Sequence, residues 1–126
     1  MSRQVPIFAA GVVFFAGALA ASATAAPAAD VAAGKAKYQQ FCASCHGKRG
    51  KGDGPAAASL RPRPRDHTDA AYMRKLKDDD IFKIIKMGGA ALGKSPYMPP
   101  WSGALSDKDI RNIVSYIRTL AQPVKK

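Results

Sequence analysis

This chain of 126 residues has only two cysteines and no glutamate. Beyond the one motif that holds both cysteines, it lacks the second Cys/His pair that a structural zinc site needs to reach about four ligands. The G-x-x-x-x-G-K-S/T pattern of a phosphate-binding loop is absent. No segment has a convincing strand pattern, and after the first 25 residues no stretch is apolar over the length of a membrane-spanning helix. The length and these absences predict a single all-α domain.

Both cysteines lie in one short motif, Cys42-Ala43-Ser44-Cys45-His46. This C-x-x-C-H spacing is typical of covalent haem c attachment, in which the two thiols add to the two vinyl groups of one haem. The histidine directly after the second cysteine is held where a ring nitrogen reaches the iron. We therefore expect one haem bound through Cys42 and Cys45, with His46 as an axial iron ligand.

Three other interpretations of this motif compete with haem. A C-x-x-C pair in an exported protein can be an oxidoreductase dithiol, although such a pair usually lies near a βαβ pattern, which this chain lacks. Zinc is disfavoured by the missing second pair of ligands, and a chance match is the third alternative. The dithiol interpretation differs most clearly from the haem interpretation, because it predicts a colourless protein with a reducible disulfide.

The first 25 residues have the pattern of a secretory signal peptide. Arg3 gives a short positive segment, residues 5–21 are apolar, and Ala-Thr-Ala at 23–25 fits the small-x-small cleavage rule. We expect residues 1–25 to be removed, which leaves a mature domain of residues 26–126 in the periplasm. The alternative is an uncleaved anchor, because the apolar run is close to the lower length limit of a membrane helix.

Two amphipathic helices are expected near the ends of the mature chain. The first covers about residues 31–42, follows Asp30 as a candidate N-cap, and carries Gly34 on its apolar face. Glycine costs a helix about 1 kcal/mol relative to alanine, so Gly34 indicates either the close approach of another helix or a simple weak spot. The last helix covers about residues 107–121 and opens with the capping box Ser106-x-x-Asp109. Its apolar stripe consists of Ile110, Ile113, Val114, Ile117 and Leu120.

The middle of the chain is expected to hold two further helices. A short one covers residues 70–76, and a longer one begins at the three aspartates 78–80 and ends at Gly88-Gly89. Acidic side chains stabilise a helix N-terminus, and glycine supplies the C-cap conformation. We assign Met73 and Met87 to the core gap-filling role that methionine most often has. The buried stripe of the longer helix consists of Ile81, Ile84 and Ile85.

Residues 47–64 are rich in glycine and basic residues and are expected to fold as a loop beside the haem. Pro55 is predicted to present a backbone carbonyl to the second ring nitrogen of His46, because metal-bound histidines usually have such an acceptor. Arg65 ends a run stiffened by alternating prolines and is a candidate partner for a haem propionate, with a solvated basic loop as the equal alternative. His67 is a rival axial ligand, but we expect it to be a surface histidine.

Met98 is the candidate for the second axial ligand. It lies 52 residues after His46, which is far enough for the chain to reach the other face of the haem. Pro99 and Pro100 restrict the backbone after it and would keep the thioether in place. Trp101 is expected to pack against the haem or its loop, with an indole N–H that needs an acceptor.

On these residues the chain resembles the small, soluble class I cytochromes c of bacteria, over about residues 31–120. The resemblance implies a cytochrome c-like fold of three to five helices around one haem, whose first and last helices cross at the glycine. It also implies His46 and Met98 as axial ligands and Pro55 as the residue that orients His46. The motifs that carry it are Gly34-x-x-x-Tyr38, Cys42-x-x-Cys45-His46, Gly54-Pro55, Met98-Pro99 and Ile113-x-x-Tyr116.

We therefore expect a periplasmic one-electron carrier rather than an enzyme. Ligation by His46 and Met98 leaves no free coordination site, and a thioether ligand raises the reduction potential. Two alternatives stay open. If Met98 does not bind the iron, the protein is an open-site haem protein for gas sensing or peroxide chemistry. The chain can also be the haem subunit of a larger redox complex.

The formal net charge of +11 falls only to +10 when residues 1–25 are removed. So basic a chain attracts nucleic acid, an anionic membrane or an acidic protein. Export argues against nucleic acid, and opposite charge speeds encounters between proteins that must meet and part quickly. We expect a monomer that docks acidic redox partners through a basic rim of Lys48, Arg49, Lys51, Lys83, Lys86 and Lys94.

Overall fold

The structure is a computed structural model, and it describes residues 1–2 and 27–122. The apolar and cleavage segments of the expected signal peptide, and the basic tail at 125–126, lie outside the described residues. Within the described part, five α-helices and two short 3₁₀ helices are present and no strand, which confirms the predicted all-α class. None of these helices is long and apolar enough to cross a membrane. The elements are α1 (Val31–Phe41), α2 (Ala43–His46), η1 (Pro55–Ser59), α3 (Ala70–Met73), α4 (Asp78–Met87), η2 (Ala90–Leu92) and α5 (Asp107–Leu120).

Helices α1 and α5 begin at the predicted caps. The Asp30 carboxylate accepts the N–H of Ala33 at 2.9 Å, which satisfies one of the free donors of the first turn of α1. At the start of α5, the Ser106 hydroxyl accepts the N–H of Asp109 at 3.1 Å, and the Asp109 carboxylate accepts the N–H of Ser106 at 3.1 Å. This is the reciprocal capping box that the sequence predicts.

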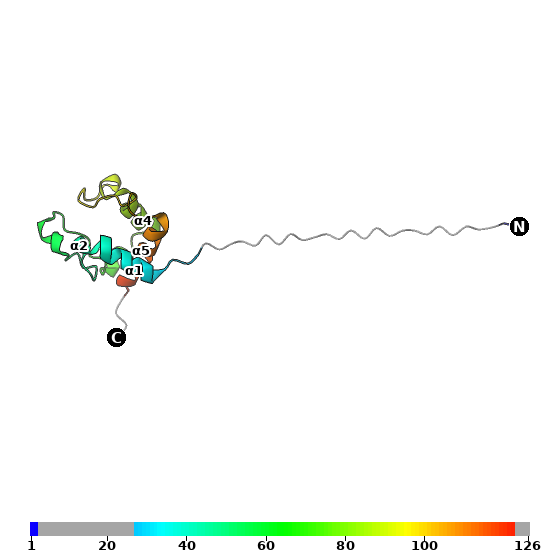
Figure 1. The fold of residues 1–126 in the computed structure, drawn as a ribbon, viewed down its shortest axis with the longest axis horizontal. Helices are drawn as coiled ribbons and strands as arrows, with labels where there is room; N and C mark the ends of the chain where they lie inside the picture. Colours follow the sequence, from blue (N-terminus) through cyan, green and yellow to red (C-terminus); the bar gives the residue numbers. More distant parts are fainter. Residues whose placement is uncertain (3–26, 123–126) are drawn as a thin grey trace.

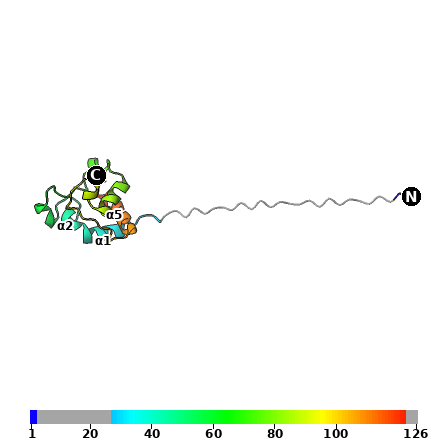
Figure 2. The same cartoon turned by 90° about the horizontal axis from the view of Figure 1, so that it is seen from above.

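Helix α1 crosses α5 at Gly34, and the two helices lie side by side in both views (Figures 1 and 2). A Cβ atom at Gly34 would lie 2.0 Å from the backbone oxygen of Asn112, so this approach requires glycine. The ring of Tyr38 packs edge-on against Tyr116 beside the crossing, with centroids 5.2 Å apart. Gly34 therefore marks a close helix contact and not a weak spot. The largest fully buried side chains are Tyr38, Met73, Ile110, Ile113 and Ile117.

The two central helices differ from the prediction at one end and at one methionine. Helix α3 ends at Met73, three residues before the expected end. Helix α4 ends at Met87, and its C-cap is Gly88, whose φ of +82° favours glycine. Met73 is buried as predicted, but the core role predicted for Met87 is wrong, because its side chain is 51% exposed. Met87 is two positions beyond buried Ile85 and so about 200° further round α4.

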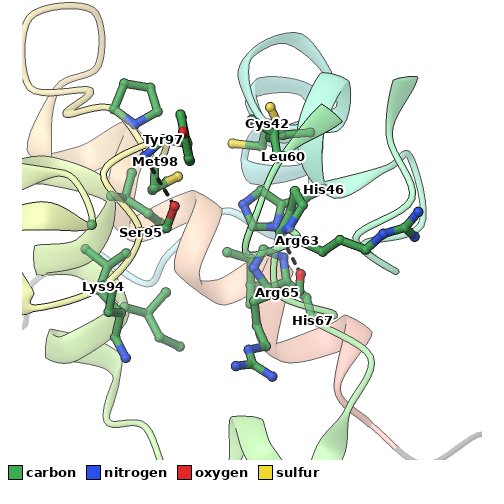
Figure 3. Close-up of a pocket in the computed structure, with 18 of the residues that line it drawn as sticks. Cys42, His46, Leu60, Arg63, Arg65, His67, Lys94, Ser95, Tyr97 and Met98 are labelled. Atoms are coloured by element: carbon green, nitrogen blue, oxygen red, sulfur yellow. Dashed lines mark hydrogen bonds between the residues drawn. The ribbon is translucent and has the colours of Figure 1, made fainter. Parts of the chain in front are cut away.

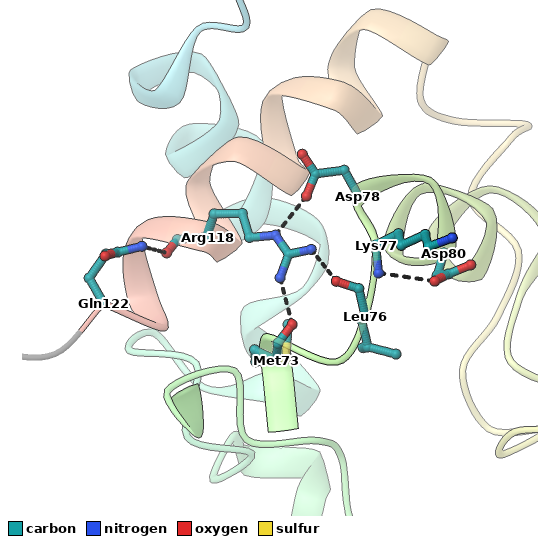
Figure 4. A network of polar contacts seen from close by, with 7 residues as sticks. All are labelled: Met73, Leu76, Lys77, Asp78, Asp80, Arg118 and Gln122. Atoms are coloured by element: carbon teal, nitrogen blue, oxygen red, sulfur yellow. Dashed lines mark hydrogen bonds and ion pairs between the residues drawn. The ribbon is translucent and has the colours of Figure 1, made fainter. Parts of the chain in front are cut away.

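Arg118 on α5 holds the connection between α3 and α4 (Figure 4). Its guanidinium donates to the Asp78 carboxylate at 2.6 Å, to the Met73 carbonyl at 2.6 Å and to the Leu76 carbonyl at 2.5 Å. The Met73 carbonyl at the end of α3 also accepts the N–H of Leu76 at 3.3 Å, so the arginine fork adds a second donor there and supplies a donor to the Leu76 carbonyl. The connection is thereby fixed against α5, and with it the side chains of Met73 and Leu76.

Candidate functional site

A cavity of about 540 Å³ opens between α1, α2 and α4 and the loops that follow them. This volume falls in the range of about 300–1,000 Å³ that is usual for ligand and cofactor pockets. Most of the wall is apolar, and Ile117 is the α5 residue that reaches it. The apolar wall includes Phe41, Leu60, Met73, Leu76, Ile81, Ile84 and Ile85.

The C-x-x-C-H motif forms one wall of this cavity. Cys42 follows the last residue of α1 and precedes α2, so the chain changes helix within the motif. The three-residue spacing of a helix then places Cys45 on the same side as Cys42, and His46 completes the turn. Both cysteines are free thiols, and Cys42, Cys45 and His46 all line the cavity. The structure thus brings the predicted attachment residues together.

One ring nitrogen of His46 is already engaged. Its Nδ1 lies 3.0 Å from the carbonyl oxygen of Arg65, to which an Nδ1–H donates (Figure 3). The other nitrogen, Nε2, is then free of a proton and able to bind a metal. Burial lowers the pKa of His46, while the hydrogen bond to Arg65 opposes that shift. The neutral imidazole, which is the ligating form, is therefore favoured at neutral pH.

The acceptor for His46 corrects the prediction that Pro55 fills this role. Pro55 begins η1, which packs beside α2, and it lies outside the cavity in a shallow surface hollow with Gln39 and Ala43. Backbone bonds fix that position, since the Gly54 N–H donates to the Cys45 carbonyl at 3.1 Å. The chain must continue to Arg65 before a carbonyl faces His46. The prolines at 62 and 64, which keep this stretch extended, are the sequence feature that indicates the Arg65 carbonyl as the acceptor.

His67 is buried beside His46, so the prediction of a surface histidine is wrong. Its side chain is 9% exposed, and its ring stacks on that of His46 with centroids 4.3 Å apart. The hydroxyl of Tyr38 is hydrogen-bonded to His67 Nδ1 at 2.9 Å. Burial, with repulsion from His46 when that ring is also protonated, lowers the pKa of His67 to about 3. His67 therefore lies on the His46 side of the cavity, away from the facing wall.

Met98 and Trp101 belong to the facing wall. The half-buried Met98 comes from the loop after η2, and its thioether lies across the cavity from the His46 ring (Figure 3). Trp101 packs edge-on against Phe41 with centroids 5.5 Å apart, and its backbone N–H donates to the Ile85 carbonyl at 3.0 Å. These contacts tie the loop to α1 and α4.

Arg65 lies at the mouth of the cavity with its guanidinium 3.8 Å from the centre of the Tyr72 ring. This cation–π contact fixes the direction of a charged side chain that remains exposed. Lys94 lines the mouth from the opposite wall (Figure 3). Two cationic side chains thus border the opening from its two sides.

The donor set fits a covalent haem better than a reactive dithiol. Burial raises the pKa of Cys42 to about 12, whereas an oxidoreductase needs a cysteine with a lowered pKa. A haem c needs two thiols and an imidazole on one wall, a second ligand on the facing wall, and an apolar space between them. The cavity supplies each of these in Cys42, Cys45, His46 and Met98.

Comparison with known proteins gives consistent matches. The family model described as "Cytochrome C oxidase, cbb3-type, subunit III" matches residues 29–117. Cytochrome c-554(547) of Halothiobacillus neapolitanus is 38% identical over 95 residues, which cover 74% of this chain and 99% of that protein. The cbb3-type cytochrome c oxidase subunit FixPc of Rhizobium leguminosarum bv. viciae is 28% identical over 88 residues, which cover 70% of this chain and 27% of that protein.

Two solved structures have the same fold. The KustC0563 c-type cytochrome matches with a TM-score of 0.56 and 25% identity, over 71% of this chain and 98% of that chain. A chain of the Kuenenia stuttgartiensis reducing HAO-like protein complex Kustc0457/Kustc0458 matches with a TM-score of 0.57 and 27% identity, over 70% of this chain and 41% of that chain.

Proposed function

Because the chain belongs to the cytochrome c family, we propose that it is a periplasmic one-electron carrier with a single covalent haem c ligated by His46 and Met98. The observation that carries the proposal is the placement of these two side chains on facing walls of one apolar cavity. The bound haem supplies a ferrous/ferric couple. If His46 and Met98 both hold the iron, they would leave no coordination site for small molecules.

The residues around the ligands have separate tasks in this proposal. Cys42 and Cys45 hold the haem covalently, and the Arg65 carbonyl sets the tautomer of His46. Metal-ligating histidines are oriented and made more basic by such an acceptor. The apolar wall excludes water, which disfavours the extra positive charge of ferric iron. The Arg65 guanidinium, oriented by Tyr72, is available at the mouth for a charge-assisted bond to a propionate.

The basic rim supports docking of an acidic redox protein. Lys48, Arg49 and Lys51 are exposed directly after the motif, Lys83 is exposed on α4, and Lys94 is exposed in the loop that precedes Met98. Lys86 contributes less, because it pairs with the Asp107 carboxylate at 2.8 Å. Opposite charges raise encounter rates between such proteins.

A second candidate is a haem subunit of a larger redox complex. It is favoured by the likeness to FixPc, named as an oxidase subunit, and to a chain of the reducing HAO-like complex. Gel filtration of the protein isolated from its own periplasm separates the two candidates. A free carrier elutes near the mass of the mature chain, and a subunit elutes with its complex.

The ligand set is tested by optical spectra of the holoprotein, made with its signal sequence in a host that attaches haem c. We expect sharp low-spin bands in the reduced protein and a weak far-red ferric band of sulfur ligation. Met98→Ala should abolish the far-red band, and Met87→Ala should leave it unchanged, because Met87 is an exposed methionine outside the cavity wall. A high-spin wild-type spectrum with ready cyanide binding would instead support an open-site protein.

A further inference from the structure

The two glycines that follow α4 have different roles. The φ of +82° at Gly88 ends the helix and favours a glycine there. Gly89 has φ −66° and ψ −39°, a conformation open to every residue type. Helix capping therefore explains Gly88 but not Gly89.

The missing side chain of Gly89 leaves room for the Met98 loop. A Cβ atom there would lie 2.2 Å from the Ser95 carbonyl oxygen and 3.2 Å from the Met98 Cβ. The first distance is far inside van der Waals contact, and the atom it meets is backbone, so the loop would have to move. Ser95 and Met98 lie together on the wall that faces His46 (Figure 3).

Both backbone groups of Gly89 also bind this loop. Its N–H donates to the Met98 carbonyl at 2.9 Å, and its carbonyl accepts the N–H of Lys94 at 2.8 Å. The Ser95 carbonyl that a Cβ would strike accepts the N–H of Met98 at 3.2 Å. A displacement of Ser95 would therefore be passed directly to the main chain of Met98.

Side-chain packing contributes little to this placement. Most residues from 90 to 97 are exposed, and Tyr97 is 59% exposed. The loop thus depends on its backbone bonds to Gly89 and, at its other end, on Trp101, whose N–H donates to the Ile85 carbonyl at 3.0 Å and whose ring packs on Phe41. Segments with few buried apolar contacts are easily displaced.

We propose that Gly89 is a positioning residue for the sixth ligand, because it seats the loop at 94–98 against the end of α4 so that the Met98 thioether faces the cavity. This inference rests on the proposed ligation of iron by Met98. Gly89 lines the cavity, but in this role it acts through Met98 and is not itself an iron ligand.

The test compares Gly89→Ala with Gly103→Ala in the haem-loaded mature protein. Gly103 is the matched control, because its added Cβ would meet nothing within 4 Å and its φ is not positive. We expect Gly89→Ala to lose most of the far-red ferric band and to bind cyanide about tenfold more tightly, because a smaller Met98-bound population competes less with cyanide. Circular dichroism should show unchanged helix content. Gly103→Ala should match the wild type in all three measurements.

Met98→Ala separates failure of this inference from failure of the proposed function. If Met98→Ala keeps the far-red band, the ligand assignment itself is wrong. If Met98→Ala removes the band while Gly89→Ala keeps it, Gly89 does not position the ligand. Should Gly89→Ala fail to load haem, Lys94→Pro decides the matter, because it deletes the N–H donated to the Gly89 carbonyl and leaves α4 intact. A wild-type band in Lys94→Pro overturns the inference, and a weakened band supports it.

Discussion

The ring of His67 lies flat against the ring of His46, with an interplanar angle of 17°. Each ring is also held at its edge, His46 by the Arg65 carbonyl at 3.0 Å and His67 by the Tyr38 hydroxyl at 2.9 Å. Tyr38 is fully buried in the core, so this second hydrogen bond ties the pair of rings to α1. Rotation of the His46 ring is therefore restrained both by an acceptor and by a neighbouring face.

Tyr38→Phe should loosen this pair of rings. The substitution leaves a buried His67 nitrogen without its partner, which we expect to cost about 1–3 kcal/mol of unfolding free energy. The paramagnetic NMR shifts of the haem methyl groups should change as well, because they depend on the plane of the axial histidine. Tyr116→Phe is the control, since Tyr116 packs on Tyr38 but the hydroxyl bonded to His67 belongs to Tyr38. Equal methyl shifts in both variants would show that the hydrogen bond does not hold the ring plane.

Arg118→Met should destabilise the protein more than Asp78→Asn. The methionine keeps an apolar stem but leaves the Leu76 carbonyl without its arginine donor and the Met73 carbonyl with only the Leu76 N–H, at an expected cost of about 1–3 kcal/mol. Asp78→Asn removes a solvent-exposed ion pair, which is worth about 0.2–1 kcal/mol, and one of the three acidic side chains at the start of α4. Urea unfolding of the holoproteins measures both changes. Equal losses would place the stabilisation in the ion pair and not in the carbonyl contacts.

The parts of the fold that the sequence predicted are those encoded over a few residues. The capping box at Ser106 spans four residues, and the C-x-x-C-H motif spans five. Such signals act locally, so they do not depend on the path of the rest of the chain. The prediction that Met87 is buried is wrong, because the position of a residue around the end of α4 decides its exposure and its residue type does not.

The residues around His46 were harder to predict because their contacts cross a long glycine-rich loop. The bond from His46 to the Arg65 carbonyl joins residues 19 apart, and the bond between Tyr38 and His67 joins residues 29 apart. The local composition does not indicate which residues after that loop contact His46 and Tyr38. The Gly-Pro pair close to the motif therefore predicts Pro55 as the acceptor for His46, and the sequence around His67 predicts a surface position for that histidine.

Stability should depend on acid through the capping box of α5. Hydrogen bonds from the Ser106 hydroxyl and N–H lower the pKa of Asp109 below its ordinary value of 3.8. The unfolded chain then binds this proton more readily than the folded one, so the stabilisation is present above the ordinary pKa and is lost as the pH falls through the lowered value. Asp109→Asn should therefore show a shallower fall in unfolding free energy between about pH 5 and pH 2.

Ser106→Ala should flatten the same profile, because it removes the hydroxyl donor to Asp109. Ser102→Ala, an exposed serine in the preceding loop, is the control and should follow the wild type. Urea unfolding across the pH series provides the measurement. A wild-type slope in both Asp109→Asn and Ser106→Ala would contradict a role for the capping box in acid sensitivity.

Electron transfer to an acidic partner should depend on charge near the attachment motif. Lys48 is exposed two residues after His46, whereas exposed Lys108 lies on α5 nine residues before Ile117 and so about 14 Å along the helix from the cavity wall. With an acidic blue-copper protein as probe, Lys48→Glu should lower the stopped-flow rate at low salt about tenfold, and Lys108→Glu should lower it much less. The rate for Lys48→Glu should also fall less steeply with added salt, because less attraction remains to be screened. Equal effects of the two variants would show that net charge alone guides the encounter, and a salt-independent wild-type rate would remove electrostatic docking from the proposed function.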